Sequence, residues 1–142
     1  MKEYEFVRVR IDDHIMSVTI NRPEVYNAVH PPLSLELNEI WDNFGQDKDL
    51  WVAVLTGEGD KAFSAGNDLK YSALPAEQKV QQPSSGFAGL KAASIAVTTG
   101  KKILLANKES IVAGGDLIMP LARKYNSEIV PIDSEHNAIF QC

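Results

Sequence analysis

The sequence is poor in cysteine and has no long apolar run. Its single cysteine is Cys142, the last residue. Because one cysteine has no partner in the chain, an internal disulfide is excluded. Such scarcity is typical of a reducing compartment such as the cytoplasm. No stretch approaches the roughly eighteen consecutive apolar residues of a transmembrane helix. The opening residues, Met-Lys-Glu-Tyr-Glu-Phe, are too charged for a secretory signal.

Positive charge is also in short supply. The chain has 14 basic against 19 acidic residues, a formal net charge of −5. This balance argues against nucleic acid or an anionic membrane as the main partner. Of the 142 residues, 44% are apolar and 23% are charged, as in an ordinary globular protein. We therefore expect a single α/β domain over residues 1–142, able to bury a core without disulfides or metal.

The first half of the chain has clear local periodicity. Apolar residues alternate with polar ones over 4–10 and 14–20, which predicts a hairpin that turns at Asp12-Asp13. Pro31-Pro32 suits the first turn of a helix. That helix would carry one apolar stripe and end at a Gly45 cap; its stripe comprises Leu33, Leu37, Ile40, Trp41 and Phe44. The apolar run over 51–56 predicts a strand buried on both faces.

The second half repeats a simple order of elements. Residues 76–85 indicate a loop or a frayed helix, and 90–97 a helix. A strand at 102–106, a helix at 117–125 and a strand at 128–132 follow. Strands that alternate with helices predict an α/β fold. In it, an N-terminal β-hairpin leads into alternating units that form a mainly parallel sheet with helices packed on it.

One candidate site lies in the loop "SAGNDL", residues 64–69. Gly66 removes side-chain bulk where the backbone comes close to another group. Asp68 is positioned to cap a following helix, whose free N–H groups would then favour an anion or an oxyanion. The alternative is an ordinary loop with an Asp cap.

Two further candidates lie near the end of the chain. Lys108 falls between a predicted strand and a predicted helix, where ligands bind in open α/β sheets, and would suit a phosphate. The alternative is a capped turn with exposed charges. Asp133 and Glu135 flank a serine after the last strand and would suit a hard divalent cation. The alternative there is a solvated acidic segment.

Motifs in the first half carry a family resemblance. Asn21-Arg22-Pro23, Asn27-Ala28 and "AGNDL", residues 65–69, occur in the order and spacing of the crotonase family. The chain resembles this enoyl-CoA hydratase/isomerase family over about residues 3–80. The resemblance implies that the Asn67 N–H is one of two donors to a thioester carbonyl. It also implies CoA contacts at Ala28, Ala65 and Asp68.

The motif resemblance stops where the family continues with a Gly-Gly-Gly-x-Glu helix start. That segment supplies the second donor and a catalytic glutamate in the family, and neither appears here. The N–H of Gly114 or Gly115, in an expected turn over 113–116, would have to replace the second donor. Asp116 would then lie near the position of an acid/base carboxylate.

The second half resembles a different family. "SGFAGL", "LANKES" and "PIDSEHNAIFQ", within residues 85–141, are similar to 1-deoxy-D-xylulose 5-phosphate reductoisomerases. This resemblance implies NADPH contacts at Asn107 and Glu109, substrate contacts at Lys108 and Ser134, and two of three Mn²⁺ or Mg²⁺ ligands at Asp133 and Glu135. The glycine-rich dinucleotide loop of that family is missing, so we expect no bound cofactor.

The two resemblances together indicate a fusion of enzyme fragments, 1–83 and 84–142, that keeps the order of elements. Three hypotheses follow for its function: a protein with no complete active site, a weak acyl-CoA binder or crotonase-like catalyst, or a residual binder of NADPH and a divalent metal. Halves that did not evolve together should fit imperfectly. We therefore expect modest stability, or a homo-oligomer formed through exposed apolar surface.

Overall fold

The computed structural model describes residues 2–84, 89–105 and 108–131. Contacts within the chain divide it into two compact units, Met1–Ala88 and Gly89–Cys142. This division lies a few residues after the expected junction. The described strands form two sheets, of three and two strands, instead of the one sheet that we expected.

The first unit opens with the predicted hairpin. Strands β1 (Val7–Asp12) and β2 (Ile15–Ile20) pair antiparallel, with Val7 opposite Ile20 and Asp12 opposite Ile15. Strand β1 starts later than predicted because the Glu36 carboxylate accepts the N–H groups of Glu5 (2.8 Å) and Phe6 (2.9 Å). These two amides are therefore bound to a helix side chain instead of the sheet.

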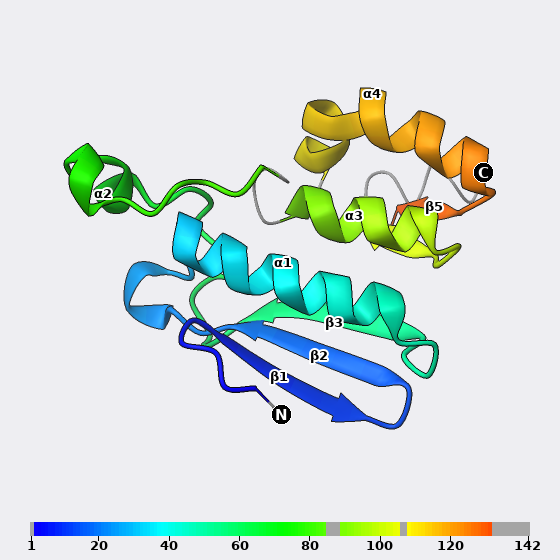
Figure 1. Ribbon diagram of the computed structural model, residues 1–142, viewed down its shortest axis with the longest axis horizontal. Helices are drawn as coiled ribbons and strands as arrows, with labels where there is room; N and C mark the ends of the chain where they lie inside the picture. The colour runs from blue at the N-terminus through cyan, green and yellow to red at the C-terminus, as the bar shows by residue number, and fades with distance from the viewer. Residues whose placement is uncertain (1, 85–88, 106–107, 132–142) are drawn as a thin grey trace. The chain divides into compact units, whose positions relative to one another are not determined.

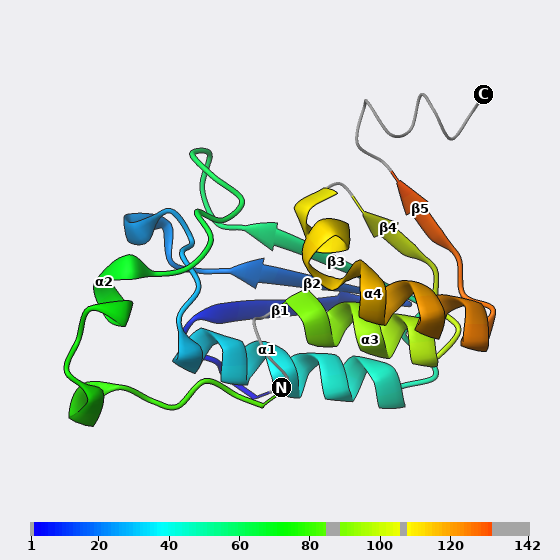
Figure 2. The same ribbon diagram turned by 90° about the horizontal axis from the view of Figure 1, so that it is seen from above.

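Helix α1 (Pro31–Gln46) begins at the predicted proline and connects β2 to β3 (Val52–Gly57), which pairs parallel with β2. The expected Gly45 cap is wrong, since the helix continues to Gln46 and the N–H of Asp47 closes it on the Asn43 carbonyl at 3.0 Å. Figure 1 shows α1 lying along one face of the β1–β2–β3 sheet, and Figure 2 shows these strands side by side.

The core of the first unit lies between α1 and this sheet. Its most deeply buried side chains include Val18, Leu33 and Leu37, each 0% exposed. The prediction that the third strand is buried on both faces is wrong, because Val52 and Val54 are each 47% exposed. Among the described residues β3 is an edge strand. A run of apolar residues cannot tell an edge strand from a central one.

Short helices interrupt the loops of the first unit. They are η1 (Pro23–Val25), α2 (Leu69–Ser72) and η2 (Ala76–Gln78). The first two flank the candidate site described below. The third occupies the segment in which a loop or a frayed helix was expected.

The second unit has the predicted order of helix, strand, helix and strand. Its elements are α3 (Gly89–Thr98), β4 (Ile103–Leu105), α4 (Lys108–Tyr125) and β5 (Ile129–Pro131). Strands β4 and β5 are parallel. Val97, Ile118 and Ala122 form a small buried core between α3 and α4.

Helix α4 is much longer than the predicted 117–125. It includes Lys108 and Glu109 as its first residues and runs through 113–116, so the expected loop at Lys108 and the expected glycine turn are wrong. Each helical glycine costs about 1 kcal/mol relative to alanine, a cost that tertiary packing of the helix can offset. Within the described residues, no helix is both long and apolar enough to cross a membrane.

Candidate functional site

A single bridge joins two distant segments at the candidate site. Val29 and Asn67 form an isolated parallel bridge. In it, the Val29 N–H donates to the Gly66 carbonyl at 2.7 Å, and the Asp68 N–H donates to the Val29 carbonyl at 2.9 Å. Successive residues of an extended segment direct their N–H groups to alternate sides. The Asn67 N–H therefore points away from Val29, and it meets no acceptor in the part of the chain that the structure describes.

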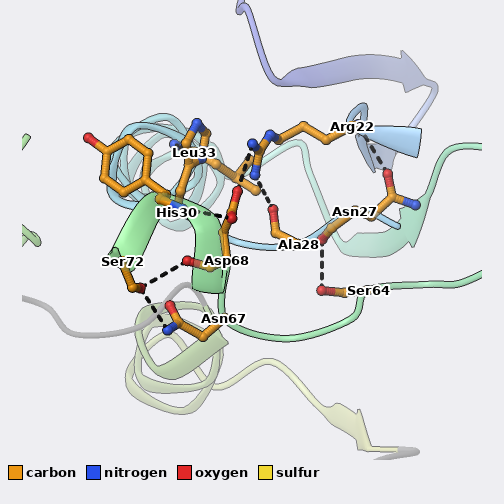
Figure 3. Close-up of polar contacts among 10 residues, drawn as sticks. Arg22, Asn27, Ala28, His30, Leu33, Ser64, Asn67, Asp68 and Ser72 are labelled. Carbon is orange, nitrogen blue, oxygen red and sulfur yellow. Dashed lines mark hydrogen bonds and ion pairs between the residues drawn. The ribbon is translucent and has the colours of Figure 1, made fainter. Parts of the chain in front are cut away.

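The Asn67 loop, residues 64–68, is fixed from within. The Ser64 hydroxyl donates to the Asn27 carbonyl at 2.8 Å and accepts the Gly66 N–H at 3.2 Å. The Asn67 side chain donates from Nδ2 to the Ser72 hydroxyl at 3.1 Å. Figure 3 shows this side chain directed toward α2. The backbone N–H of Asn67 is thus held in place by the hydrogen bonds on both sides of it.

The structure explains the glycine at position 66 differently from the sequence prediction. A Cβ at Gly66 would meet nothing within 4 Å, so space is not the constraint. Its φ of +83° lies in the left-handed region, which residues with a side chain adopt only with strain. Glycine is therefore required here by backbone conformation.

Asn27 is hydrogen-bonded through its side chain to the segments that flank the Asn67 loop. Its side chain is 1% exposed, and its Nδ2 donates to the carbonyls of Glu58 at 3.0 Å and Ala62 at 2.8 Å. Its Oδ1 accepts the Arg22 N–H at 3.0 Å. One buried amide thus connects the end of β2, the turn after β3 and the segment just before the Asn67 loop.

An ion pair closes the other side of the site. The Arg22 guanidinium donates to the Asp68 carboxylate at 2.9 Å and also to the Ala28 carbonyl (Figure 3). The second Asp68 oxygen accepts the Tyr71 N–H at 3.0 Å, which confirms the predicted cap of the following helix. Burial alone would raise the pKa of Asp68. The Tyr71 N–H and the Arg22 guanidinium outweigh burial and hold that pKa below its usual value.

His30 is a buried residue of the site that sequence reasoning missed. It is 5% exposed, and its Nδ1 accepts the Leu33 N–H at 3.4 Å, so it caps α1. The rings of Phe6 and Tyr71 meet it edge-on at 4.5 and 5.1 Å between centroids. Burial, followed by the charge of Arg22, lowers the pKa of His30 to about 4. The sequence signal for this capping role was the position of His30 directly before Pro31-Pro32, because the residue before the first helical turn is the helix cap.

Comparison with known proteins identifies the family of this chain. The sequence profile described as enoyl-CoA hydratase/isomerase matches residues 10–125, most of the chain. The chain belongs to this family. The match extends well past residue 83, beyond the motifs that carried the resemblance in the sequence. The α/β architecture, with its N-terminal hairpin followed by a helix, is that of the family's solved structures.

Solved enoyl-CoA hydratases have a similar fold. One from Mycobacterium marinum superposes with a TM-score of 0.58 at 29% identity, covering 72% of this chain and 47% of that one. A probable enoyl-CoA hydratase/isomerase from Mycobacterium abscessus gives 0.55 at 31% identity, covering 73% and 38%. The chain therefore spans less than half of the length of these enzymes.

Curated relatives carry a different name. A chloroplastic 1-deoxy-D-xylulose 5-phosphate reductoisomerase from Oryza sativa subsp. japonica is 45% identical over 148 aligned positions, covering 93% of this chain and 31% of that protein. The corresponding enzyme of Mentha piperita is 58% identical over 57 residues, 40% of this chain and 12% of its own length. The chain spans at most 33% of the eight reductoisomerases compared.

The first unit brings four of the predicted residues together. Ala28, Ala65, Asn67 and Asp68 all lie at the Val29–Asn67 bridge. The Asp68 side chain is engaged by Arg22 and the Tyr71 N–H, and its main chain is hydrogen-bonded to Val29 and Ser72. Gly115 and the exposed Asp116 lie in α4 of the second unit.

The candidates from the reductoisomerase resemblance are only partly described. Lys108 and Glu109 are the first residues of α4. Asn107, Asp133, Ser134 and Glu135 lie outside the described residues. In the described ranges no three acidic, histidine or cysteine side chains come together as a metal site would require.

Proposed function

We propose that this chain joins fragments of two enzymes, and that it binds the thioester carbonyl of an acyl-CoA at the Asn67 N–H without a complete active site. The observation that carries the proposal is the Val29–Asn67 bridge, which leaves that N–H directed away from its own strand partner. A fixed backbone donor of this kind is what an oxyanion site needs.

The surroundings of the Asn67 loop suit a CoA thioester. Phe63 is 55% exposed and Leu69 is 76% exposed, so apolar side chains flank the loop on both sides. Lys61 and Lys70 are exposed cations in the same segment. Apolar surface beside positive charge matches a ligand that combines an acyl chain with phosphates.

A second oxyanion donor has no support at the expected glycine pair. By the family resemblance it would come from a glycine-rich helix start, but residues 113–116 lie inside α4. Amides inside a helix donate to the carbonyl four residues earlier. Removal of one oxyanion donor typically lowers the catalytic rate by about 10²- to 10³-fold.

The two buried ionisable groups beside the Asn67 loop, Asp68 and His30, are already engaged. Asp68 is bound to Arg22 and to the Tyr71 N–H, and its pKa is lowered. His30 uses Nδ1 to cap α1 and is almost wholly buried. Neither side chain is free to remove a proton from a ligand held at Asn67, which supports binding without efficient turnover.

Calorimetric titration with crotonyl-CoA tests the proposal. We expect saturable binding that weakens when the thioester is replaced by the S-butyl thioether of CoA, which has no carbonyl. Hydration of crotonyl-CoA should stay at the level of the buffer blank. Equal affinity for the thioester and the thioether would contradict the role of Asn67 in binding the carbonyl. Turnover clearly above the blank would contradict the proposal that the active site is incomplete.

A second candidate function rests on the identity to reductoisomerases, which reaches 58% over 57 residues. It is residual binding of NADPH and a divalent metal through Asn107, Lys108, Glu109, Ser134, Asp133 and Glu135. Two carboxylates form a weak site at best. Titration with Mn²⁺ while tryptophan fluorescence and melting temperature are followed tests it, and no change at millimolar Mn²⁺ would exclude it.

A further inference from the structure

Arg22 contacts both segments of the bridge that orients the Asn67 N–H. One of its guanidinium nitrogens donates to the carbonyl of Ala28, the residue directly before Val29. The other donates to the carboxylate of Asp68, the residue directly after Asn67, at 2.9 Å (Figure 3). A single planar group therefore connects the two segments just outside their mutual hydrogen bonds.

The base of the Arg22 side chain is itself fixed. Its N–H donates to the Asn27 side chain at 3.0 Å, and its carbonyl accepts the N–H groups of Val25 at 3.1 Å and Asn27 at 2.8 Å. Its guanidinium also lies over the Phe6 ring, 5.7 Å from the centroid. The side chain is 12% exposed and that of Asp68 is 7% exposed, so water competes little for these contacts.

From this geometry we propose that Arg22 is a positioning residue, which sets the direction of the Asn67 N–H by holding Ala28 and Asp68 at a fixed separation. The guanidinium is suited to this because its donors form a rigid planar fork that can serve two acceptors at once. A lysine would bring the same charge on a single nitrogen. The link to ligand binding rests on the proposed function, whereas the link to the Asn67 amide does not.

The test compares Arg22→Lys with Arg8→Lys in the full chain. Arg8 is a matched control, because it pairs with Glu58 at the same 2.9 Å but is 63% exposed. The first readout, without ligand, is the ¹⁵N–¹H resonance of the Asn67 amide together with the exchange rate of the Asp68 amide, which donates to the Val29 carbonyl in the bridge. Exchange is measured against the amide of Val18 in the core. We expect Arg22→Lys to shift the Asn67 resonance and to speed exchange at Asp68 by about tenfold or more while Val18 changes little, as in local opening. Arg8→Lys should leave all three amides unchanged.

The second readout is the affinity for crotonyl-CoA. If the wild type binds, Arg22→Lys should weaken binding by about tenfold at a temperature where both proteins are fully folded, the size expected when one oriented donor is misplaced. If the wild type does not bind, the proposed function fails, and the Asn67 resonance and the Asp68 exchange rate still decide the role of Arg22.

Two outcomes would overturn the inference. One is an Asn67 resonance and an Asp68 exchange rate in Arg22→Lys that match the wild type. The other is an increase in exchange at Asp68 no larger than that at Val18, which would mean a general loss of stability. Where Arg22→Lys fails to fold, Asp68→Asn provides the same readouts, because asparagine keeps the helix cap but removes the charged partner.

Discussion

The side-chain Nδ2 of Asn27 donates to the carbonyl of Ala62 at 2.8 Å, across 35 residues of sequence. This hydrogen bond ties the segment after η1 to the residues just before the Asn67 loop. The buried amide of Asn27 satisfies backbone groups that no strand or helix pairs, which explains why a polar side chain is almost wholly enclosed there.

Loss of the Asn27 side chain should therefore be costly. Asn27→Gly keeps the left-handed backbone, whose φ is +56°, but leaves its polar partners unsatisfied. We expect it to lower the free energy of unfolding by about 2–4 kcal/mol. Asn27→Ala should lose roughly 1 kcal/mol more from backbone strain. Urea denaturation measures both, with the exposed Asn43→Ala as control; a loss below that of the control would contradict the role of this amide.

Gly57 should tolerate no side chain. A Cβ there would lie 2.2 Å from the carbonyl oxygen of Phe63 and 2.6 Å from the Asn27 Nδ2. Gly57→Ala is expected to cost about 3 kcal/mol or more, because backbone would have to move. Gly66→Ala, which has space but an unfavourable φ, should cost about 1–2 kcal/mol. Denaturation of the two variants side by side checks the order, and the reverse order would show that the close approach at Gly57 is not a constraint.

His30 should make the first unit sensitive to mild acid. Its pKa is about 4 in the folded chain against an ordinary 6.5, so the unfolded chain binds its proton more tightly. Stability from the neutral imidazole is therefore complete above pH 6.5 and falls as the pH is lowered toward 4, by roughly 1–3 kcal/mol.

Denaturation at pH 7 and pH 5 measures this dependence. His30→Asn, which keeps a helix cap, should flatten the curve over this range. His14→Asn removes the other histidine of the described residues and should leave the His30 contribution in place. A curve for His30→Asn as steep as that of the wild type would show that another group is responsible.

The Arg22–Asp68 and Arg8–Glu58 pairs of the first unit should differ in their contribution to stability. Arg22→Gln leaves the Asp68 carboxylate buried without its ionic partner, so we expect a loss of about 3–5 kcal/mol. Arg8→Gln breaks a pair whose side chains are 63% and 38% exposed, and should cost about 0–1 kcal/mol. Thermal and urea unfolding of both variants provide the comparison; equal losses would mean that burial does not strengthen the Arg22 contact.

Sequence patterns predicted the elements whose signal is local. The hairpin, the start of α1 at Pro31 and the cap at Asp68 follow from alternation, proline placement and a short polar side chain before a helix. Sequence patterns failed where one local pattern is compatible with two structures. The Gly114-Gly115 pair suggested a turn, but α4 runs through it, since packing of Ile118 and Ala122 against Val97 is a tertiary contribution.

The sequence by itself determined the family, the order of strands and helices, and the loop that carries Asn67, because motifs and periodicity act over a few neighbouring residues. Tertiary structure alone decided the direction of the Asn67 N–H, the burial of His30 and the exposure of one face of β3. Each of these depends on which distant segments meet: Val29 beside Asn67, Arg22 beside Asp68, and β2 on one side of β3. Hydrogen-bond direction and burial are properties of such contacts, and no local pattern encodes them.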